Sequence, residues 1–541
     1  MRVFRAGAIV CVAASLVTGW TLLDPAIKAA SSPTGPPTFY VRPGGHDTAA
    51  GTSPATAWRT LARASRAVLR PGTRLLLLGG NQYHGSLLLS SADAGNAKAP
   101  VLVSSYGKGR ATIVSSTNGI MVFDTSGVTI RDLVITGNGA GSASTAGIQM
   151  YSDRTSGRLG HVFVSKVDIS GFGFGIAIGA THDGAGFRNV RVASSALHSN
   201  LDAGLASYGP DFDPAAPGYA HQGIYLSHVR AFRNLGDPAN TIRNTGSGIE
   251  LGSVAGAKVV NSQAYGNGGA GGSVTEGPIG MWAYDSTRVV MAHDVSHGNK
   301  SSNVHDGGGF GLDRETSRSV LEYDLSYGNH GAGLLLYSAP AAPAAQNGNV
   351  IRFNISYGDA RARNHVIGGM AVGGRVNNAS LYQNTVVIAG SNSQPAFKTT
   401  GVEHHIRVLN NILVAASGPV VETVQRKTTR EVFFAGNDYY VAPGRTWLVQ
   451  WGKSSQYLSL ATWRGATGDE RVNGKPTGHV VAPRFIGPLT GSGGGVGFKL
   501  GHRSKLIQAG INLRRLFGIH PGAITFSGQA YQVLAPNVGA Q

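Results

Sequence analysis

The sequence has a single cysteine among 541 residues, Cys11, and it lies in an apolar N-terminal stretch. A chain processed after that stretch would contain no cysteine, which excludes disulfide frameworks, zinc–thiolate sites and cysteine nucleophiles. Charged residues are also scarce, at 14%, whereas hydrophobic residues make up 42%. This balance excludes a disordered chain, so a large packed core must supply the stability of the fold.

The sequence lacks any long hydrophobic run beyond its N-terminus. Two arginines precede an apolar stretch from Ala6 to Leu23, and small residues follow at positions 29–32. This order is typical of a secretory signal peptide, which we expect over residues 1–29. We therefore expect a secreted or extracytoplasmic protein with no membrane span after signal cleavage.

Acidic side chains are outnumbered by basic ones, 28 to 46, which gives a net charge of +18 at pH 7. Such a charge favours a polyanionic partner. The basic residues are scattered and form no nucleic-acid-binding motif, so nucleic acid is not the expected partner. For an exported protein, a polysaccharide with acidic groups is the better candidate, and we expect the protein to be a monomer.

Glycine is abundant, with 79 residues, and much of it belongs to a repeat. Phrases such as "YGN" and "HGN" recur every 30–34 residues and end at Asn200, Asn234, Asn267, Asn299, Asn329 and Asp359. A second phrase, a glycine followed by alternating residues, is interleaved with the first, as in "GIELG" from Gly248 and "GMWAY" from Gly280. Strand-like runs repeated at a fixed period and separated by Asn and Gly turns predict a parallel β-helix, an all-β solenoid. Its single-residue left-handed corners should need Asn or Gly.

Two further stretches lie at the ends of the repeat region. The first contains Tyr40, Val41, Pro43, Gly45, Asp47, Ala57, Trp58, Thr60, Leu61, Pro71 and Gly72, and the second reads "FKLGHRSKLIQAGINL". They resemble the N-terminal region and the closing coil of secreted proteins of the pectin-lyase-like superfamily. The resemblance implies a right-handed parallel β-helix with an N-terminal capping helix at residues 55–70. It implies residues 30–99 as the strand and capping region, 100–420 as the β-helix, and 421–541 as late coils with an insertion, a short helix near 459–464 and a C-terminal cap. The superfamily contains hydrolases, lyases, epimerases and binding proteins, so it leaves the reaction open.

Stacking the glycine phrases predicts one outward face. With each glycine counted as position one, the third position places Glu250, Trp282 and Asp313 in successive coils, with Asp285 at a strand end. The fifth position adds a set of side chains that includes Tyr208, Tyr284, Glu315 and Tyr337. The same register would bury Arg314, which is costly, so we expect either a bulge there or Arg314 beyond the sheet, paired with Glu315 or Asp285.

The stretch "HDGGGFGLDRET", residues 305–316, concentrates five ionisable groups: His305, Asp306, Asp313, Arg314 and Glu315. Part of it matches a calcium-binding nonapeptide, but only once, and that motif works by repetition. A phosphate loop is excluded because the Gly-Lys-Ser/Thr ending is missing. We therefore predict no metal site and interpret glycines 307–309 as space for a substrate to approach the backbone beside Asp313.

Carboxylates beside aromatic rings are what glycosidic bond cleavage requires, because one acid protonates the leaving oxygen and a second carboxylate activates water or attacks carbon. We predict Glu250 and Asp313 as the acid/base pair, with backbones roughly 9–10 Å apart across two coils. Asp285 or Asp306 is the alternative second carboxylate. The residues predicted to bind substrate are Trp282, Tyr284, Tyr337, Tyr208, Arg314 and His305. Such a hydrolase needs no cofactor.

Two alternatives stay open at this point. A polysaccharide lyase would need a base such as His305, Lys300, Arg314 or Tyr284, and calcium held by Asp285, Asp306 and Asp313 to neutralise a uronate. A dense acidic cluster would repel a polyuronate without that metal, so we place hydrolysis ahead of elimination. A non-catalytic glycan-binding solenoid would use the aromatic face without paired carboxylates.

Overall fold

The computed structural model describes residues 36–138, 144–362 and 367–541. The expected signal peptide, with Cys11, lies outside the described residues. The described chain is an all-β parallel solenoid of about 12 turns with very little helix, which confirms the predicted fold class. It forms two compact units, unit 1 (Met1–Asp211 with Gly218–Arg230) and unit 2 (Phe212–Pro217 with Ala231–Gln541), which are described separately.

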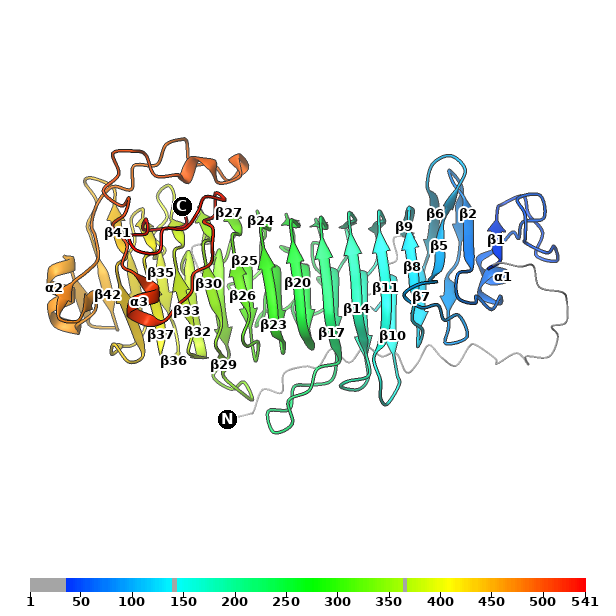
Figure 1. The fold of residues 1–541 in the computed structure, drawn as a ribbon, viewed down its shortest axis with the longest axis horizontal. Helices are drawn as coiled ribbons and strands as arrows, with labels where there is room; N and C mark the ends of the chain where they lie inside the picture. The colour runs from blue at the N-terminus through cyan, green and yellow to red at the C-terminus, as the bar shows by residue number, and fades with distance from the viewer. Residues whose placement is uncertain (1–35, 139–143, 363–366) are drawn as a thin grey trace. The chain divides into compact units, whose positions relative to one another are not determined.

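Each coil of unit 1 contributes one strand to each of three parallel sheets, drawn from blue through cyan to green in Figure 1. Sheet 1 contains β4 (Leu87–Leu89), β7 (Ile120–Phe123), β10 (Ala146–Ser152), β13 (Phe174–Ala180) and β16 (Ala203–Tyr208). Sheet 2 contains β1 (Thr38–Val41), β2 (Arg74–Leu78), β5 (Val101–Tyr106), β8 (Val128–Arg131), β11 (Leu159–Ser165), β14 (Phe187–Ala193) and β17 (His221–Ser227). Sheet 3 contains β3 (Gln82–His84), β6 (Ala111–Ser115), β9 (Leu133–Gly137), β12 (Asp168–Ser170) and β15 (Ala196–His198).

Unit 2 repeats the same three-sheet arrangement. Its sheet 1 contains β19 (Ser247–Gly252), β22 (Ile279–Tyr284), β25 (Gly308–Asp313), β28 (Leu334–Ser338), β32 (Met370–Asn377), β35 (Phe397–Thr399), β39 (Val421–Thr423), β42 (Val449–Trp451) and the antiparallel β43 (Ser455–Tyr457), with β29 (Gln346–Asn347) and β36 (Val402–His404) also paired to β32. Sheet 2 contains β20 (Val254–Val260), β23 (Thr287–Ala292), β26 (Val320–Glu322), β30 (Val350–Arg352), β33 (Ser380–Tyr382), β37 (Ile406–Leu409) and β40 (Val432–Ala435). Sheet 3 contains β21 (Gln263–Tyr265), β24 (Val295–His297), β27 (Leu325–Tyr327), β31 (Ile355–Tyr357), β34 (Thr385–Val387), β38 (Ile412–Ala415) and β41 (Asp438–Val441). Strand β18 (Arg230–Phe232) lies where the chain passes from unit 1 to unit 2, and β44 (Arg471–Val472) with β45 (Lys475–Pro476) forms a short antiparallel pair.

Helices are short and few in the described chain. Helix α1 spans only Leu61–Ser65, with Thr60 as its N-cap, so the helix expected over residues 55–70 is much shorter. The physical reason is that Trp58 is extended and exchanges backbone hydrogen bonds with Tyr40 and Arg42. Helix α2 (Leu460–Thr467) is the helix expected near 459–464, and α3 is Leu513–Phe517. No helix in the described ranges is both long and apolar enough to cross a membrane.

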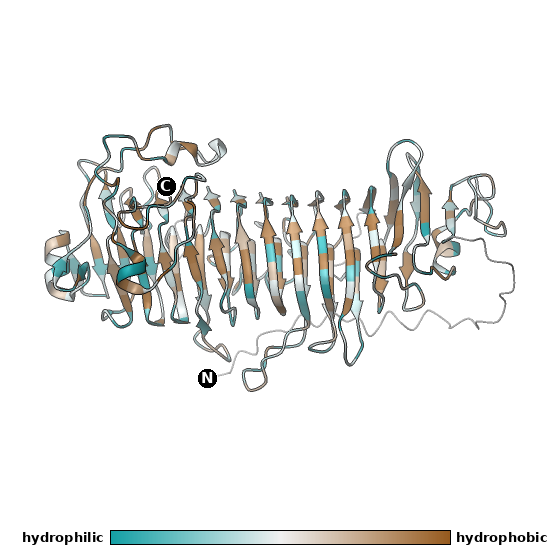
Figure 2. Cartoon of the chain, in the orientation of Figure 1, coloured by the Kyte–Doolittle hydropathy of each residue, from teal (hydrophilic) through white to brown (hydrophobic). Residues whose placement is uncertain are grey.

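Alternation along each strand fills the core of both units. In unit 2, Ile249 pairs with Met281 and Leu251 with Ala283 in adjacent coils, and all four side chains are fully buried. Figure 2 shows hydrophobic residues in brown along the strands, interrupted by hydrophilic residues in teal. The inward positions read from the glycine phrases are therefore confirmed for these coils.

The repeating Asn residues form a buried hydrogen-bonded ladder. The side-chain oxygen of Asn299 accepts from the backbone N–H and the side chain of Asn267, and Asn329 does the same for Asn299, all at 2.9–3.2 Å. Asp359 continues the ladder by accepting from Asn329. The repeat therefore satisfies buried backbone donors where each coil leaves sheet 3.

The left-handed corners are less selective than the sequence indicated. The residue after each sheet 1 strand has positive φ at Ser253, Asp285 and Arg314, with values of 52°, 44° and 41°. Neither Asn nor Gly is required there, because neighbouring coils fix the corner and compensate the modest cost of that conformation. This corrects the expectation that only Asn or Gly occupies the corners.

Candidate functional site

The strand register of unit 2 places Asp313 one pleat further along β25 than expected. Glu250 pairs with Trp282, Trp282 with Gly311, and Asp313 with Tyr337. Asp313 is therefore on the predicted face but beside Tyr337 instead of Trp282, because the stacked phrase begins at Gly309 and not at Gly311. Two coil spacings and two residues along the strand put the Glu250 and Asp313 backbones roughly 12 Å apart, further than the expected spacing.

Arg314 lies just beyond the end of β25, which removes the difficulty of burying its charge in the core. Its Nε is 4.0 Å from the Asp285 carboxylate, and its guanidinium lies over the Tyr284 ring at 4.8 Å from the centroid. Despite burial, the negative charge of Asp285 raises the pKa of Arg314 above its usual value. The second of the two expected arrangements, an ion pair with a neighbouring carboxylate, is the one observed.

The outward face is largely covered where the sequence indicated an open surface. Glu250, Trp282 and Tyr284 are only 5–6% exposed, and Asp285 is 9% exposed. The Trp282 indole donates to the Ser247 hydroxyl at 3.0 Å and packs against Tyr284 at 5.1 Å. A sugar ring cannot stack on aromatic faces that other side chains already occupy, so these two rings are not available as a stacking surface.

Asp306 and Asp313 keep part of their surface open. Surrounding protein removes most of their water, and this burial raises the pKa of Asp313 to about 7. Burial also raises the pKa of Asp306 to about 8, and the charge of Asp313 adds to the increase. The Arg314 backbone N–H donates to Asp313 at 2.6 Å, and the Gly277 N–H donates to Asp306 at 3.1 Å. The charge of Asp313 therefore acts on Asp306, and near pH 7 Asp306 is mostly protonated while Asp313 is partly ionised.

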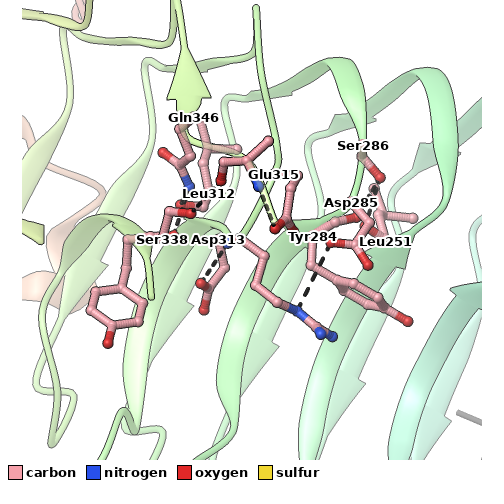
Figure 3. Close-up of polar contacts among 12 residues, drawn as sticks. Leu251, Tyr284, Asp285, Ser286, Leu312, Asp313, Glu315, Ser338 and Gln346 are labelled. Carbon is pink, nitrogen blue, oxygen red and sulfur yellow. Dashed lines mark hydrogen bonds and ion pairs between the residues drawn. The ribbon is translucent and has the colours of Figure 1, made fainter. Parts of the chain in front are cut away.

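A second carboxyl pair consists of Asp285 and Glu315. Burial raises the pKa of Glu315 to about 8, and a hydrogen bond with the Asp285 side chain adds to the increase. The Ala344 N–H donates to the other side of Glu315 at 3.4 Å. A proton on Glu315 explains how these two carboxyl groups can lie in contact inside the protein. Figure 3 shows Tyr284, Asp285, Asp313 and Glu315 gathered at the ends of neighbouring strands.

Sequence reasoning missed Glu276 as a member of the site. Its charge raises the pKa of both Asp306 and Asp313, and its carboxylate accepts from the Asn244 backbone at 3.2 Å. The residue lies in a loop before β22, outside every repeated phrase, so no periodic signal marks it. We call Asp285, Asp306, Asp313, Glu315 and Glu276 the carboxylate cluster.

The remaining predicted residues divide by location. Tyr337 is half-buried beside the cluster, and burial together with the charges of Asp313 and Asp306 raises its pKa. His305 is exposed next to Asp306, with its backbone N–H bonded to Asn303. Tyr208 belongs to unit 1, where it is buried against Gly179 and accepts from Gln149, so it is not part of the cluster in unit 2.

The glycines before Asp313 serve coil packing. A Cβ atom on Gly309 would lie 2.1 Å from the Ser326 hydroxyl, and one on Gly308 would lie 2.7 Å from the Ala332 carbonyl. Gly307 has a φ of 73°, which glycine adopts at low cost. The expectation that these glycines open space for a substrate is therefore corrected, because the next coil fills the space beside Gly308 and Gly309.

Neither of two open grooves on the described chain includes a member of the carboxylate cluster. One, of about 510 Å³, is in unit 1, and the other, of about 740 Å³, is in unit 2. Within the part of the chain that the structure describes, no group of three or more His, Cys, Asp or Glu residues is arranged to hold a metal ion.

Comparison with solved structures identifies proteins of similar fold. A GH136 lacto-N-biosidase from Eubacterium ramulus aligns with a TM-score of 0.50 and 16% identity over 68% of this chain. The alignment spans 65% of that enzyme's length. This likeness supports the parallel β-helix fold that the resemblance to the pectin-lyase-like superfamily implied.

Two further solved structures align with lower scores. The A-module of the mannuronan C-5 epimerase AlgE4 from Azotobacter vinelandii has a TM-score of 0.45 and 14% identity, covering 71% of this chain and 91% of the module. A mannuronic acid-specific family 6 polysaccharide lyase from human gut microbiota has a TM-score of 0.47 and 11% identity, covering 75% of this chain and 87% of the lyase. No protein-family model matches the sequence. No curated protein sequence matches it either.

Proposed function

We propose that this protein is a secreted, carbohydrate-active enzyme that cleaves glycosidic bonds of a polysaccharide by carboxylate acid/base hydrolysis. The single observation that carries the proposal is the partly open pair Asp306 and Asp313, whose pKa values are raised to about 8 and about 7. Glycoside hydrolysis requires one carboxyl group that holds a proton and another that has lost it. A coupled pair of this kind supplies both at a pH near neutrality.

The environments of the two carboxyl groups favour different roles. Asp313 accepts a short hydrogen bond from the Arg314 N–H, and the Arg314 charge also favours its ionised form. It therefore loses its proton first and acts as the base or nucleophile. Asp306 keeps its proton to higher pH and donates it to the leaving oxygen. Glu250, predicted from the sequence as the partner of Asp313, is more deeply buried and is retained as the alternative acid.

The proposal also includes the substrate-binding residues, the substrate class and the absence of a cofactor that were predicted from the sequence. Tyr337 and Arg314 border the pair and would contact the sugar, and His305 would line its open side. The substrate class is a polysaccharide, neutral or acidic, and the net charge of +18 favours attraction of an acidic one to the protein surface. The hydrolase requires no cofactor and acts as a monomer outside the cytoplasm.

The experiment is a panel of neutral and acidic polysaccharides assayed in two channels, new reducing ends and the ultraviolet absorbance of unsaturated uronyl products. Hydrolysis gives reducing ends without that absorbance. On the substrate that is cleaved, Asp313→Asn and Asp306→Asn should each lower kcat by about 10²–10⁴, the usual loss when an acid or base is removed. Circular dichroism melting checks that each variant folds.

Glu250→Gln is the discriminating variant. If it loses as much activity as Asp313→Asn while Asp306→Asn keeps full turnover, Glu250 is the partner and Asp306 is not. Full turnover in both the Asp313 and the Asp306 variants would refute the proposed site. Absorbance of unsaturated products would replace hydrolysis with elimination.

A further inference from the structure

The groove of about 740 Å³ in unit 2 lies at the ends of β27 and β31, on sheet 3. Tyr327 and Tyr357, the last residues of these strands, line it together with the segment 389–393. None of the ten described residues that line it belongs to the carboxylate cluster. Its volume falls in the usual range for sites that hold small organic ligands.

The two tyrosine rings of the groove are fixed in place by their neighbours. Tyr327 and Tyr357 are register partners in adjacent coils. The Tyr327 ring stacks on His297 at 4.5 Å, and the Tyr357 ring packs edge-on to Phe498 at 5.5 Å. Both side chains remain partly exposed. Pre-ordered rings lose little entropy on binding, and each one joins an apolar body to a polar hydroxyl.

Glycines of three successive coils form the base of the groove. Gly328, Gly358 and Gly390 all have positive φ, at 66°, 59° and 70°. A Cβ atom at Gly390 would meet nothing within 4 Å, and one at Gly358 would meet only the Ala389 side chain at 3.6 Å. In contrast to Gly308 and Gly309, these positions leave open space above the backbone, which a ligand can approach closely.

Arg361 is the one charged residue among the ten that line the groove. Its side chain is exposed, and its backbone N–H donates to the Asn329 carbonyl at 3.2 Å. The facing segment is held by Asn392, whose side chain donates to the Ala360 carbonyl at 2.8 Å. The Arg361 guanidinium lies in the same lining as tyrosine and serine hydroxyls, and none of the ten lining residues has a carboxylate. This combination favours a ligand that carries both hydroxyl groups and a negative charge.

We propose that this groove is a second glycan-binding site, separate from the carboxylate cluster, for an oligosaccharide that carries carboxylate or sulfate groups. Arg361 binds the anionic group, and the tyrosine hydroxyls and serine hydroxyls bind the sugar. The site anchors a polysaccharide to the surface and does not depend on whether the carboxylate cluster cleaves it.

The test is affinity electrophoresis of the full chain in gels that contain polygalacturonate, dextran sulfate or neutral dextran. We expect retardation by at least one of the two acidic polymers and none by dextran; comparison of the two distinguishes carboxylate from sulfate recognition. Arg361→Ala should weaken binding at least about tenfold, because a lost charge-assisted hydrogen bond costs more than one order of magnitude in affinity. Arg430→Ala, an exposed arginine of the same unit outside the groove, is the control with the same charge change.

Three outcomes would overturn the second site: equal retardation by dextran, no binding to either acidic polymer, or equal weakening by Arg361→Ala and Arg430→Ala. Asp313→Asn separates this site from the catalytic proposal. Retardation that persists in Asp313→Asn and is lost in Arg361→Ala places binding in the groove. Retardation that is lost in Asp313→Asn and persists in Arg361→Ala would place binding at the carboxylate cluster and contradict the proposed second site.

Discussion

At the scale of single residues, the site depends on carboxyl groups that the fold removes largely from water. Asp313 ends β25, and Asp306 lies in the loop that leads into it, with a φ of 53°. Asp285 and Arg314 also have positive φ, but they share that geometry with Ser253, so it belongs to the coil corner and does not mark function. The raised pKa values distinguish the pair from ordinary surface carboxylates.

The pH dependence of cleavage follows from these values. The base Asp313 must be ionised, so kcat/KM should fall as pH drops below about 7. The acid Asp306 must be protonated, so kcat/KM should also fall as pH rises above about 8. A narrow bell between these limits is expected in initial-rate measurements from pH 4 to 10, and its two apparent values belong to the pair. A flat profile from pH 5 to 9 would contradict the assignment.

At the scale of elements, buried ladders join the coils, and one of them contains acidic rungs. Between sheets 2 and 3, Asp294, Asp324, Asn354 and Asn384 occupy successive corners, and each backbone N–H of the first three bonds to the next side chain. The Asn354 amide also donates to the Leu321 carbonyl and to Asn384. An ionised Asp324 side chain has no hydrogen to donate where Asn354 donates from its amide. Its Oδ2 atom has no hydrogen-bond partner.

Replacing Asp324 by Asn should therefore stabilise unit 2, more at pH 8 than at pH 5. Burial raises the pKa of Asp324 well above its usual value. Ionisation of Asp324 therefore costs no stability below its unfolded-state pKa of about 4, and the cost grows as the pH rises above that value. An asparagine carries no charge and would donate to the Asn354 oxygen. We expect a gain of at least about 1 kcal/mol in the free energy of unfolding at pH 8. Denaturant titrations at both pH values measure it.

Asn354→Asp is the matched control for this substitution. It adds an acidic rung to the same ladder and removes two donated hydrogen bonds, so it should destabilise the protein, and more at pH 8 than at pH 5. Equal stability of wild type and Asp324→Asn at both pH values would show that the ladder tolerates the buried charge without cost.

At the scale of the whole molecule, the net charge of +18 favours long-range attraction of the acidic polysaccharide proposed as a ligand. Scattered basic residues attract a polyanion over about one Debye length, roughly 10 Å at 0.1 M salt. Affinity for an acidic polysaccharide should therefore fall at least about tenfold between 50 mM and 500 mM NaCl, an order-of-magnitude expectation for several screened contacts. Isothermal titration of polygalacturonate at several salt concentrations measures it, with neutral dextran as the comparison. Affinity that does not change with salt concentration would contradict an electrostatic contribution to polysaccharide binding.

The sequence by itself determined the solenoid. A 30–34-residue repeat with alternating inward residues leaves few other ways to bury Ile249, Leu251 and Met281, so the coil and its core could be read from the pattern. The same pattern identified the face on which Asp313 lies, but placed it one pleat away from its position at the end of β25. Local periodicity carries this information because each coil contacts chiefly the coils on either side of it.

Only the tertiary structure decided which side chains of that face work together. The register of β25 differs by two residues from the predicted one, so Asp313 lies beside Tyr337 instead of Trp282. Side chains along a strand alternate with a period of two, so a shift of two residues leaves Asp313 on the same face. The alternating pattern therefore cannot detect such a shift. The packing of Trp282 against Ser247 and Tyr284 and the pairing of Asp285 with Glu315 are side-chain contacts that the repeat does not specify. Glu276 comes from a loop with no repeat at all. Loops that fold over a regular face are fixed by their contacts in space, and those contacts leave no period in the sequence.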